Sequence, residues 1–293
     1  MDSSAPNVPD LDALWDYNHP AESERRFRQF LRAASDDALR AETLTQIARA
    51  QGLQRQFEAA HATLDQVELM PIGNWPRVQV RYFLERGRVF NSARQPDRAV
   101  PLFGQAYERA FAARQTALAV DALHMLAIAD DEQALAWNLK ALALAEASSD
   151  PQARRWLVAL YNNLGWTYFD RGEYATALAH FEKALVEREV RGEETESRIA
   201  RWCIAKTLRR LDRVDEALQT QLELLTQLDR AGESDGYVDE EIAECLFQLN
   251  RWAEARSYFG SAYQKLSQDV WLVEREPARV ERLKALSEAD SRQ

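Results

Sequence analysis

The sequence is poor in the residues that build metal sites and disulfide frameworks. Among 293 residues there are two cysteines, four histidines and ten glycines. Two cysteines, Cys203 and Cys245, cannot form a disulfide framework, which favours a reducing, cytoplasmic location. The low glycine content is typical of a chain made of long regular elements rather than of many tight turns.

Long hydrophobic runs are also missing. No stretch approaches the roughly 18 consecutive apolar residues of a membrane-spanning helix. Residues 1–9 are polar and have no apolar central segment, so we predict a disordered tail here rather than a signal peptide. The sequence therefore predicts neither a membrane-spanning helix nor a signal peptide.

Positive charge is in short supply. The chain has 37 Lys and Arg residues against 47 Asp and Glu, which gives a net charge of −10. Nucleic-acid binding draws most of its affinity from neutralising phosphates, and anionic membranes require the same excess of cations. The sequence therefore predicts that neither nucleic acid nor membrane is a partner.

Catalytic and cofactor motifs are absent as well. The sequence has no HExxH, CxxC, GxSxG or glycine-rich phosphate loop, and its histidines are dispersed. Asp121 and His124 form a local acid–histidine pair three residues apart, and no third residue stands in register with them. We therefore predict that the protein is not an enzyme and holds no metal or cofactor.

What the chain does contain is helical periodicity. Apolar residues recur at intervals of three and four, as in Leu157, Leu160, Tyr161, Leu164 and Tyr168. This spacing places them on one face of a helix, whereas a strand would need alternation at two. An all-α fold is predicted.

One segment carries a specific motif, Y-x2-L-G-x2-Y followed by G-x-Y and A-x3-F-x2-A. Its residues are Tyr161, Leu164, Gly165, Tyr168, Gly172, Tyr174, Ala177, Phe181 and Ala184. The segment resembles the tetratricopeptide repeat (TPR), a pair of antiparallel helices that approach closely where small residues face each other. Here those residues are Gly165 and Ala177.

Copies of the motif occur along most of the chain. A small residue opens each predicted second helix at Ala60, Ala99, Ala134, Ala177, Ala217 and Ala255. Another lies twelve residues before each of them, at Ala48, Gly87, Ala122, Gly165, Ala205 and Ala243. Repeats three and five depart from the pattern, with Asn138 and Gln221 in place of the aromatic residue.

The resemblance implies a right-handed α-solenoid of about six helix pairs, each packed only on its neighbours. Intervals of 35 to 43 residues make it similar to the longer-repeat variety, such as kinesin light chain. An irregular N-terminal helix pair (10–36) is predicted before the solenoid (37–268) and a C-terminal capping helix (269–293) after it. The predicted repeats are about 37–72, 75–113, 115–148, 150–192, 194–232 and 235–268.

In this family the first helix of each pair lines a concave groove that binds peptides. The resemblance places these residues in such a groove: Arg88, Asn91, Asn162, Asn163, Trp166, Trp202, Lys206 and Arg209. Asn162-Asn163-Leu164-Gly165 is similar to a run in kinesin light chain repeats whose asparagine bonds the main chain of a peptide. An amide offers both a donor and an acceptor, as a peptide group requires. The alternative is that these asparagines bond neighbouring helices.

These aromatic residues divide into two sets. Trp166 and Trp202 fall on the predicted groove side, where they are either binding anchors or packing residues. Trp156, Tyr161 and Trp252 fall at helix-packing positions, which predicts core locations.

Charge is unevenly placed in the last third of the chain. Residues 198–213 are mainly basic, and residues 233–244 contain six acids and no base. Either these charges pair between neighbouring helices, or they form a polarised groove that orients a bound segment.

The predicted function is a non-catalytic scaffold or adaptor that binds a protein or peptide segment, an acidic segment being the favoured candidate. Two alternatives stay open. One is a bacterial regulatory TPR sensor for a signalling peptide or regulator, and the other is a structural TPR protein that self-associates into a homo-oligomer.

Overall fold

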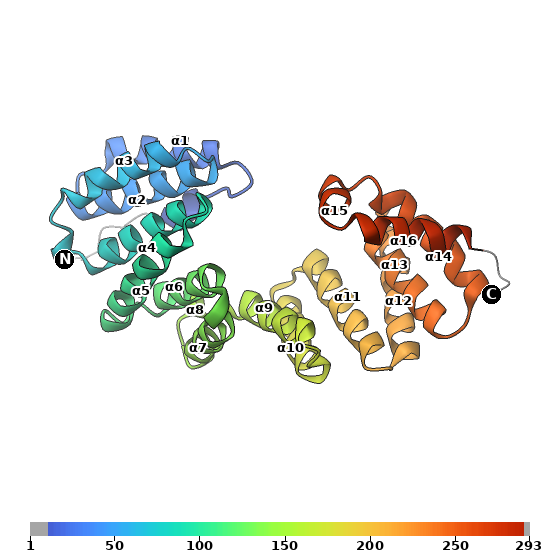
Figure 1. The fold of residues 1–293 in the computed structure, drawn as a ribbon. Coiled ribbons are helices and arrows are strands. Elements are labelled where there is room, and N and C mark those ends of the chain that lie inside the picture. Colours follow the sequence, from blue (N-terminus) through green and yellow to red (C-terminus); the bar gives the residue numbers. More distant parts are fainter. Residues whose placement is uncertain (1–10, 290–293) are drawn as a thin grey trace, which may run out of the picture. The chain divides into compact units, whose positions relative to one another are not determined.

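The protein is an all-α chain of paired helices, as the periodicity predicts. A computed structural model describes residues 11–289, and within that range every regular element is a helix (Figure 1). The predicted disordered tail (1–9) lies outside the described residues. The chain divides after Leu160 into two compact units, so that the boundary falls within one helix.

The first unit is a succession of helices joined by short turns. Its elements are η1 (Leu11–Leu14), α1 (Pro20–Ala33), α2 (Asp37–Leu53), α3 (Phe57–Glu68), η2 (Ile72–Asn74), α4 (Pro76–Ser92), α5 (Pro96–Ala112), α6 (Thr116–Ala129), η3 (Asp131–Gln133), α7 (Ala134–Glu146) and α8 (Pro151–Arg154). Each α-helix packs against the next one in sequence, and α2 also packs against α4. First helices of successive pairs are therefore neighbours.

The second unit repeats this plan. Its elements are α9 (Leu157–Asp170, whose first turn belongs to the first unit), α10 (Tyr174–Arg191), α11 (Glu194–Arg210), α12 (Val214–Ala231), α13 (Gly236–Gln248), α14 (Trp252–Leu266), α15 (Val270–Arg275) and α16 (Pro277–Glu288). Here α11 and α13 are the first helices of successive pairs. The last helix, α16, packs on α14 and buries Leu283 there.

The N-terminal region is irregular. Among the described residues that precede α2, a 3-10 helix, η1, is followed by one α-helix, α1. The Asp16 carboxylate accepts hydrogen bonds from the backbone N–H groups of Asn18 and His19, which bends the chain immediately before Pro20. Pro20 then opens α1, because proline fits the first turn of a helix and not its interior.

Close packing within a pair depends on a glycine and an aromatic ring. A Cβ atom added at Gly165 would lie 2.5 Å from the Phe181 ring, and one at Gly87 would lie 2.6 Å from Phe103. The sequence pairs Gly165 with Ala177, but the space in front of Gly165 is filled by Phe181. Ala177 is nevertheless fully buried.

Pairs without the aromatic ring carry alanine instead of glycine on the first helix. Ala48, Ala122 and Ala205 stand in register with Leu64, Asn138 and Gln221, respectively. Leu, Asn and Gln side chains are smaller than a Phe ring and leave room for the alanine methyl group on the first helix. The total side-chain volume at the contact is therefore roughly constant. The exception is the last repeat, which combines Ala243 with Phe259.

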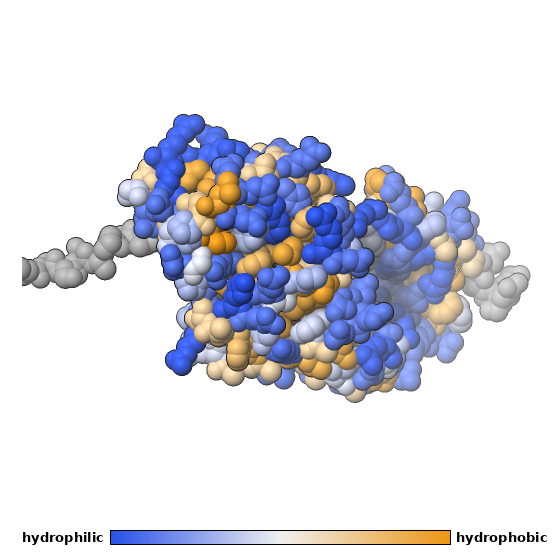
Figure 2. Space-filling view, turned by 60° about the vertical axis from the view of Figure 1, so that its left-hand side comes forward, coloured by the Kyte–Doolittle hydropathy of each residue, from blue (hydrophilic) through white to orange (hydrophobic). Residues whose placement is uncertain are grey.

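The surface does not carry one dominant apolar area on the face that Figure 2 shows. That face is mostly hydrophilic, with apolar residues gathered in small separate patches. Single exposed apolar residues are normal on a folded protein and need no partner.

Candidate functional site

Two asparagines of α9 present free amide groups. Asn162 and Asn163 are half-buried, and neither side chain forms a hydrogen bond with another residue of the described range. The Asn163 backbone oxygen accepts from the Thr167 hydroxyl at 2.9 Å. Both amides therefore keep their donors and acceptors available.

Trp166, one helical turn further along α9, meets Trp202 of α11. Their ring centroids are 6.1 Å apart, and Trp166 also packs edge-on against Phe169 and Phe181. The Trp202 indole N–H donates to the Tyr237 carbonyl of α13 at 3.1 Å. Both tryptophans are half-buried, so each combines a fixed orientation with an accessible part of the ring.

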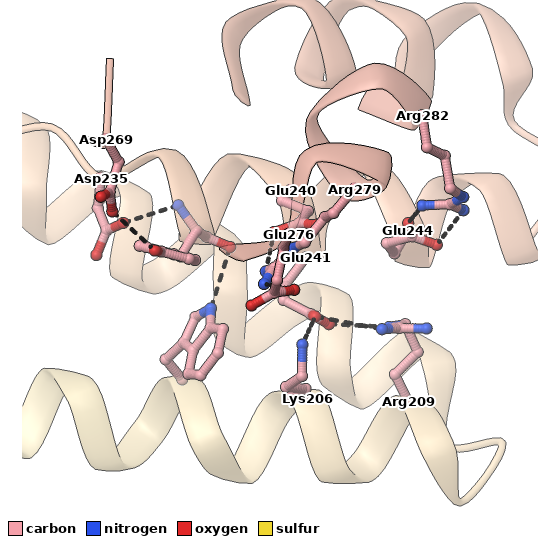
Figure 3. Close-up of polar contacts among 12 residues, drawn as sticks. Lys206, Arg209, Asp235, Glu240, Glu241, Glu244, Asp269, Glu276, Arg279 and Arg282 are labelled. Atoms are coloured by element: carbon pink, nitrogen blue, oxygen red, sulfur yellow. Dashed lines mark hydrogen bonds and ion pairs between the residues drawn. The ribbon is translucent and has the colours of Figure 1, made fainter. Parts of the chain in front are cut away.

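Lys206 and Arg209 of α11 share one carboxylate. Both point toward α13, where Glu241 accepts from Lys206 Nζ at 2.6 Å and from Arg209 Nε at 2.9 Å (Figure 3). Glu241 is only 1% exposed. Burial alone would raise the pKa of this carboxyl, but the two cations hold its pKa below the ordinary value. Two cations against one anion leave one positive charge in excess.

The uneven charge along the sequence is largely resolved by pairing between helices. Further ion pairs join Arg198 to Glu233, Arg201 to Glu189, Lys265 to Asp239, Arg279 to Glu240, and Arg282 to Glu244. Most link residues about one repeat apart, and Figure 3 shows the pairs of Arg279 with Glu240 and of Arg282 with Glu244 along α13. The pairing interpretation is confirmed for these residues.

The remaining predicted groove residues, Arg88 and Asn91, belong to the first unit. Arg88 donates to Glu85 of its own helix at 2.7 Å and to Asp121 of α6. The neighbouring charges raise the pKa of Arg88 and lower that of Asp121. Glu85 also lies 3.8 Å from Arg49 of α2, so the network connects three successive first helices. Asn91 is half-buried near the end of α4.

His124 does not act with Asp121 as a free acid–base pair. Asp121 is bound to Arg88, and burial lowers the pKa of His124. The ring instead stacks obliquely on Trp156, with centroids 5.0 Å apart.

The packing aromatic residues are only partly where the sequence placed them. Tyr161 is buried and Trp156 half-buried, but Trp252 is 46% exposed. Trp252 lies at the first position of α14 and meets the Phe247 ring edge-on, at 4.3 Å between centroids. A helix N-terminus projects beyond the packed face, which explains the exposure.

Sequence reasoning missed a cavity of about 430 Å³ in the second unit. It lies between α11, α12 and α13 and is lined by Thr195, Arg198, Ile199, Trp202, Leu224, Leu228, Glu233, Ser234, Asp235, Tyr237 and Val238. Trp202 therefore belongs both to the cavity and to the predicted groove. The only signal in the sequence was Ile199 and Trp202 three residues apart on the same helix face.

Residues 11–289 offer little to other classes of site. No cluster of three or more His, Cys, Asp or Glu residues could hold a metal ion there. No helix among these residues is both long and apolar enough to cross a membrane. Burial raises the pKa of Cys203 and Cys245 to about 12, which makes both thiols weak nucleophiles at neutral pH.

Comparisons with known proteins agree with the helix pairs. Two sequence models described as tetratricopeptide repeat match residues 121–185 and 162–235. These matches identify tetratricopeptide repeats within residues 121–235. No curated protein matches its sequence.

Solved structures resemble this TPR chain over nearly its whole length. A signal transduction ATPase with a TPR sensor from Pyrococcus horikoshii is 15% identical, with a TM-score of 0.70 over 92% of this chain and 42% of its own. NprR in complex with its cognate peptide NprX is 17% identical, with a TM-score of 0.51 over 98% and 85%. Aspartyl phosphate phosphatase F from Bacillus subtilis is 14% identical, with a TM-score of 0.51 over 94% and 80%.

At these identities the likeness establishes the fold alone. This chain also spans less than half of the ATPase, so the likeness concerns one part of that larger protein.

Proposed function

We propose that the protein is a non-catalytic scaffold whose second unit binds a peptide segment of another protein along α9 and α11. The proposal rests on the side-chain amides of Asn162 and Asn163, which form no hydrogen bond within the described residues and lie on the same helix as Trp166, which contacts Trp202. Amides can bond the main chain of a peptide of any sequence. Fixed aromatic rings bury much area at little entropic cost, which makes them frequent anchors in binding sites.

The charges near Trp202 favour an acidic segment. Lys206 and Arg209 carry one positive charge more than Glu241 neutralises, and Lys206 Nζ lies 4.9 Å from the Trp202 ring. A carboxylate of the partner would form charge-assisted hydrogen bonds with this excess charge. In the first unit, Arg88 and Asn91 stay predicted contacts.

Two further points support this function. One of the similar structures holds a peptide, as its description states. The reduced, deeply buried cysteines fit a cytoplasmic protein.

The test begins with selection of peptides from a random displayed library on the full chain. Affinity of a selected peptide is then measured by fluorescence anisotropy for the wild type and for Asn163→Ala. We expect a loss of about tenfold, since one or two main-chain hydrogen bonds are removed. Gln264→Ala, an exposed amide on α14, is the matched control and should bind as the wild type does. Equal affinity of all three proteins would refute the role of Asn163.

The alternative function is a regulatory sensor. It is favoured by the likeness to a structure described as containing a TPR sensor. Small-angle X-ray scattering with and without a selected peptide separates the two, because a sensor changes its radius of gyration on binding. Sedimentation equilibrium of the free chain tests the self-associating alternative, which requires a stable oligomer.

A further inference from the structure

The cavity between α11, α12 and α13 is built as an apolar site with fixed walls. Leu224, Leu228 and Val238 are buried and form one side. Ile199 of α11 faces it while remaining 52% exposed. This exposed part leaves apolar surface of the cavity wall accessible from outside.

The aromatic part of the wall is held by hydrogen bonds. Trp202 donates to the Tyr237 carbonyl, and the Tyr237 hydroxyl donates to the Asp269 carboxylate at 3.1 Å. Asp235 caps α13 by accepting from the Tyr237 backbone N–H at 2.8 Å. Because these residues are fixed, an entering group pays little for ordering the site.

The mouth of the cavity is polar. Arg198 forms an ion pair with Glu233 at 2.9 Å, and the Asp235 carboxylate caps α13. The excess positive charge of Lys206 and Arg209 over Glu241 lies one to two turns beyond Trp202 on α11. An apolar subsite and a cationic subsite therefore stand side by side on one face of α11.

We propose that this cavity takes a large apolar side chain of the bound peptide, while Lys206 and Arg209 take a carboxylate of the same segment. This rests on the proposed function and specifies the partner, which carries an apolar residue near an acidic one. The volume of about 430 Å³ falls in the range of well-formed binding pockets.

The geometry of α11 sets the spacing between the two groups. Ile199 and Lys206 are seven residues apart on the helix. A rise of 1.5 Å per residue places them roughly 10 Å apart along the axis. An extended peptide covers about 3.3–3.6 Å per residue, so the apolar and acidic residues should be about three positions apart.

The test uses synthetic Gly/Ser peptides with a fluorescent label. One series carries a Phe and an Asp separated by one to six positions, and others carry Phe alone, Asp alone or neither. Binding to the full chain is measured by fluorescence anisotropy. We expect the tightest binding at a separation of about three, with each single-residue peptide weaker by about tenfold or more.

Paired variants assign the apolar group to the cavity. Ile199→Glu should weaken the Phe-containing peptides about tenfold and leave the Asp-only peptide unchanged. Val190→Glu, which places the same charge at an 82% exposed position of α10, is the control and should change neither. Lys206→Met should weaken only the Asp-containing peptides. Thermal melting of all variants verifies folding.

Each other outcome overturns the proposal. No dependence on separation, no binding of any peptide in the series, or equal effects of the two glutamate variants would each exclude an apolar anchor in the cavity. Native mass spectrometry showing a small molecule retained there would assign the cavity to a different ligand. If Asn163→Ala weakens library-selected peptides while Ile199→Glu does not, the proposed function survives and only this inference fails.

Discussion

At the scale of single residues, the helix contacts depend on volume at one position per pair. Gly165→Ala would put a methyl group against the Phe181 ring, and we expect a loss of about 1–3 kcal/mol in unfolding free energy. Gly260→Ala is the control, because its Cβ would meet only ordinary contact at 3.8 Å. Removing a glycine from the interior of α14 should stabilise by roughly 0.5–1 kcal/mol. Urea denaturation followed by circular dichroism distinguishes the two.

The contact between Gly165 and Phe181 also predicts that a second substitution restores part of the stability lost in Gly165→Ala. Adding Phe181→Leu to Gly165→Ala recreates the Ala48–Leu64 combination of the first repeat. The double variant should be more stable than the sum of the two single changes implies. Simple additivity would show that the two side chains do not share one space.

Gln221 is a residue whose replacement should stabilise the protein. It is fully buried on α12, and neither its amide nitrogen nor its oxygen has a hydrogen-bond partner in the described range. Leucine has a similar volume and no polar atoms, so Gln221→Leu should gain about 1–3 kcal/mol. Gln264→Leu, on the exposed side of α14, should change stability by less than about 0.5 kcal/mol. A lower melting temperature for Gln221→Leu would show that its amide is satisfied.

At the scale of elements, buried ion pairs join successive first helices. The folded-state pKa of Glu241 lies below its ordinary value of 4.5. The ion pairs of Glu241 with Lys206 and Arg209 therefore stabilise the fold at pH values above 4.5. This contribution is lost as the pH falls through the folded-state pKa of Glu241.

An acid titration of stability tests this pair. Glu241→Gln should lower the urea midpoint at pH 7, and its difference from the wild type should shrink between pH 5 and pH 3. Glu281→Gln, exposed on α16, is the control and should follow the wild type throughout. A difference that stays constant with pH would mean that the Glu241 charge is not what joins α11 to α13.

At the scale of the whole molecule, a repeat array needs a closing element. Leu283 of α16 is fully buried and belongs to the same apolar cluster as Phe259 of α14. Leu283→Ala should cost about 2–5 kcal/mol, as for other large-to-small core changes. Deletion of residues 270–293 should go further and expose the α14 surface, producing self-association in sedimentation velocity runs. A truncated chain that stays monomeric and melts unchanged would show that α16 is not a cap.

Much of the fold follows from local sequence. Helical periodicity gives the all-α class, and the twelve-residue interval between small residues gives the pairing of helices, because both depend on side chains close in sequence. The sequence also places an irregular region before the repeats, whereas the bend before Pro20 is made by the Asp16 side chain and follows from no periodic pattern.

The candidate site divides in the same way. The sequence alone determined which residues lie on the first helices, including Asn163, Trp166 and Trp202. Only the tertiary structure decided that Lys206 and Arg209 share Glu241, that Trp252 is exposed, and that α11, α12 and α13 enclose a cavity. These features join residues about one repeat apart. They depend on how adjacent helix pairs are rotated and spaced against each other, a quantity that helical periodicity within one pair does not encode.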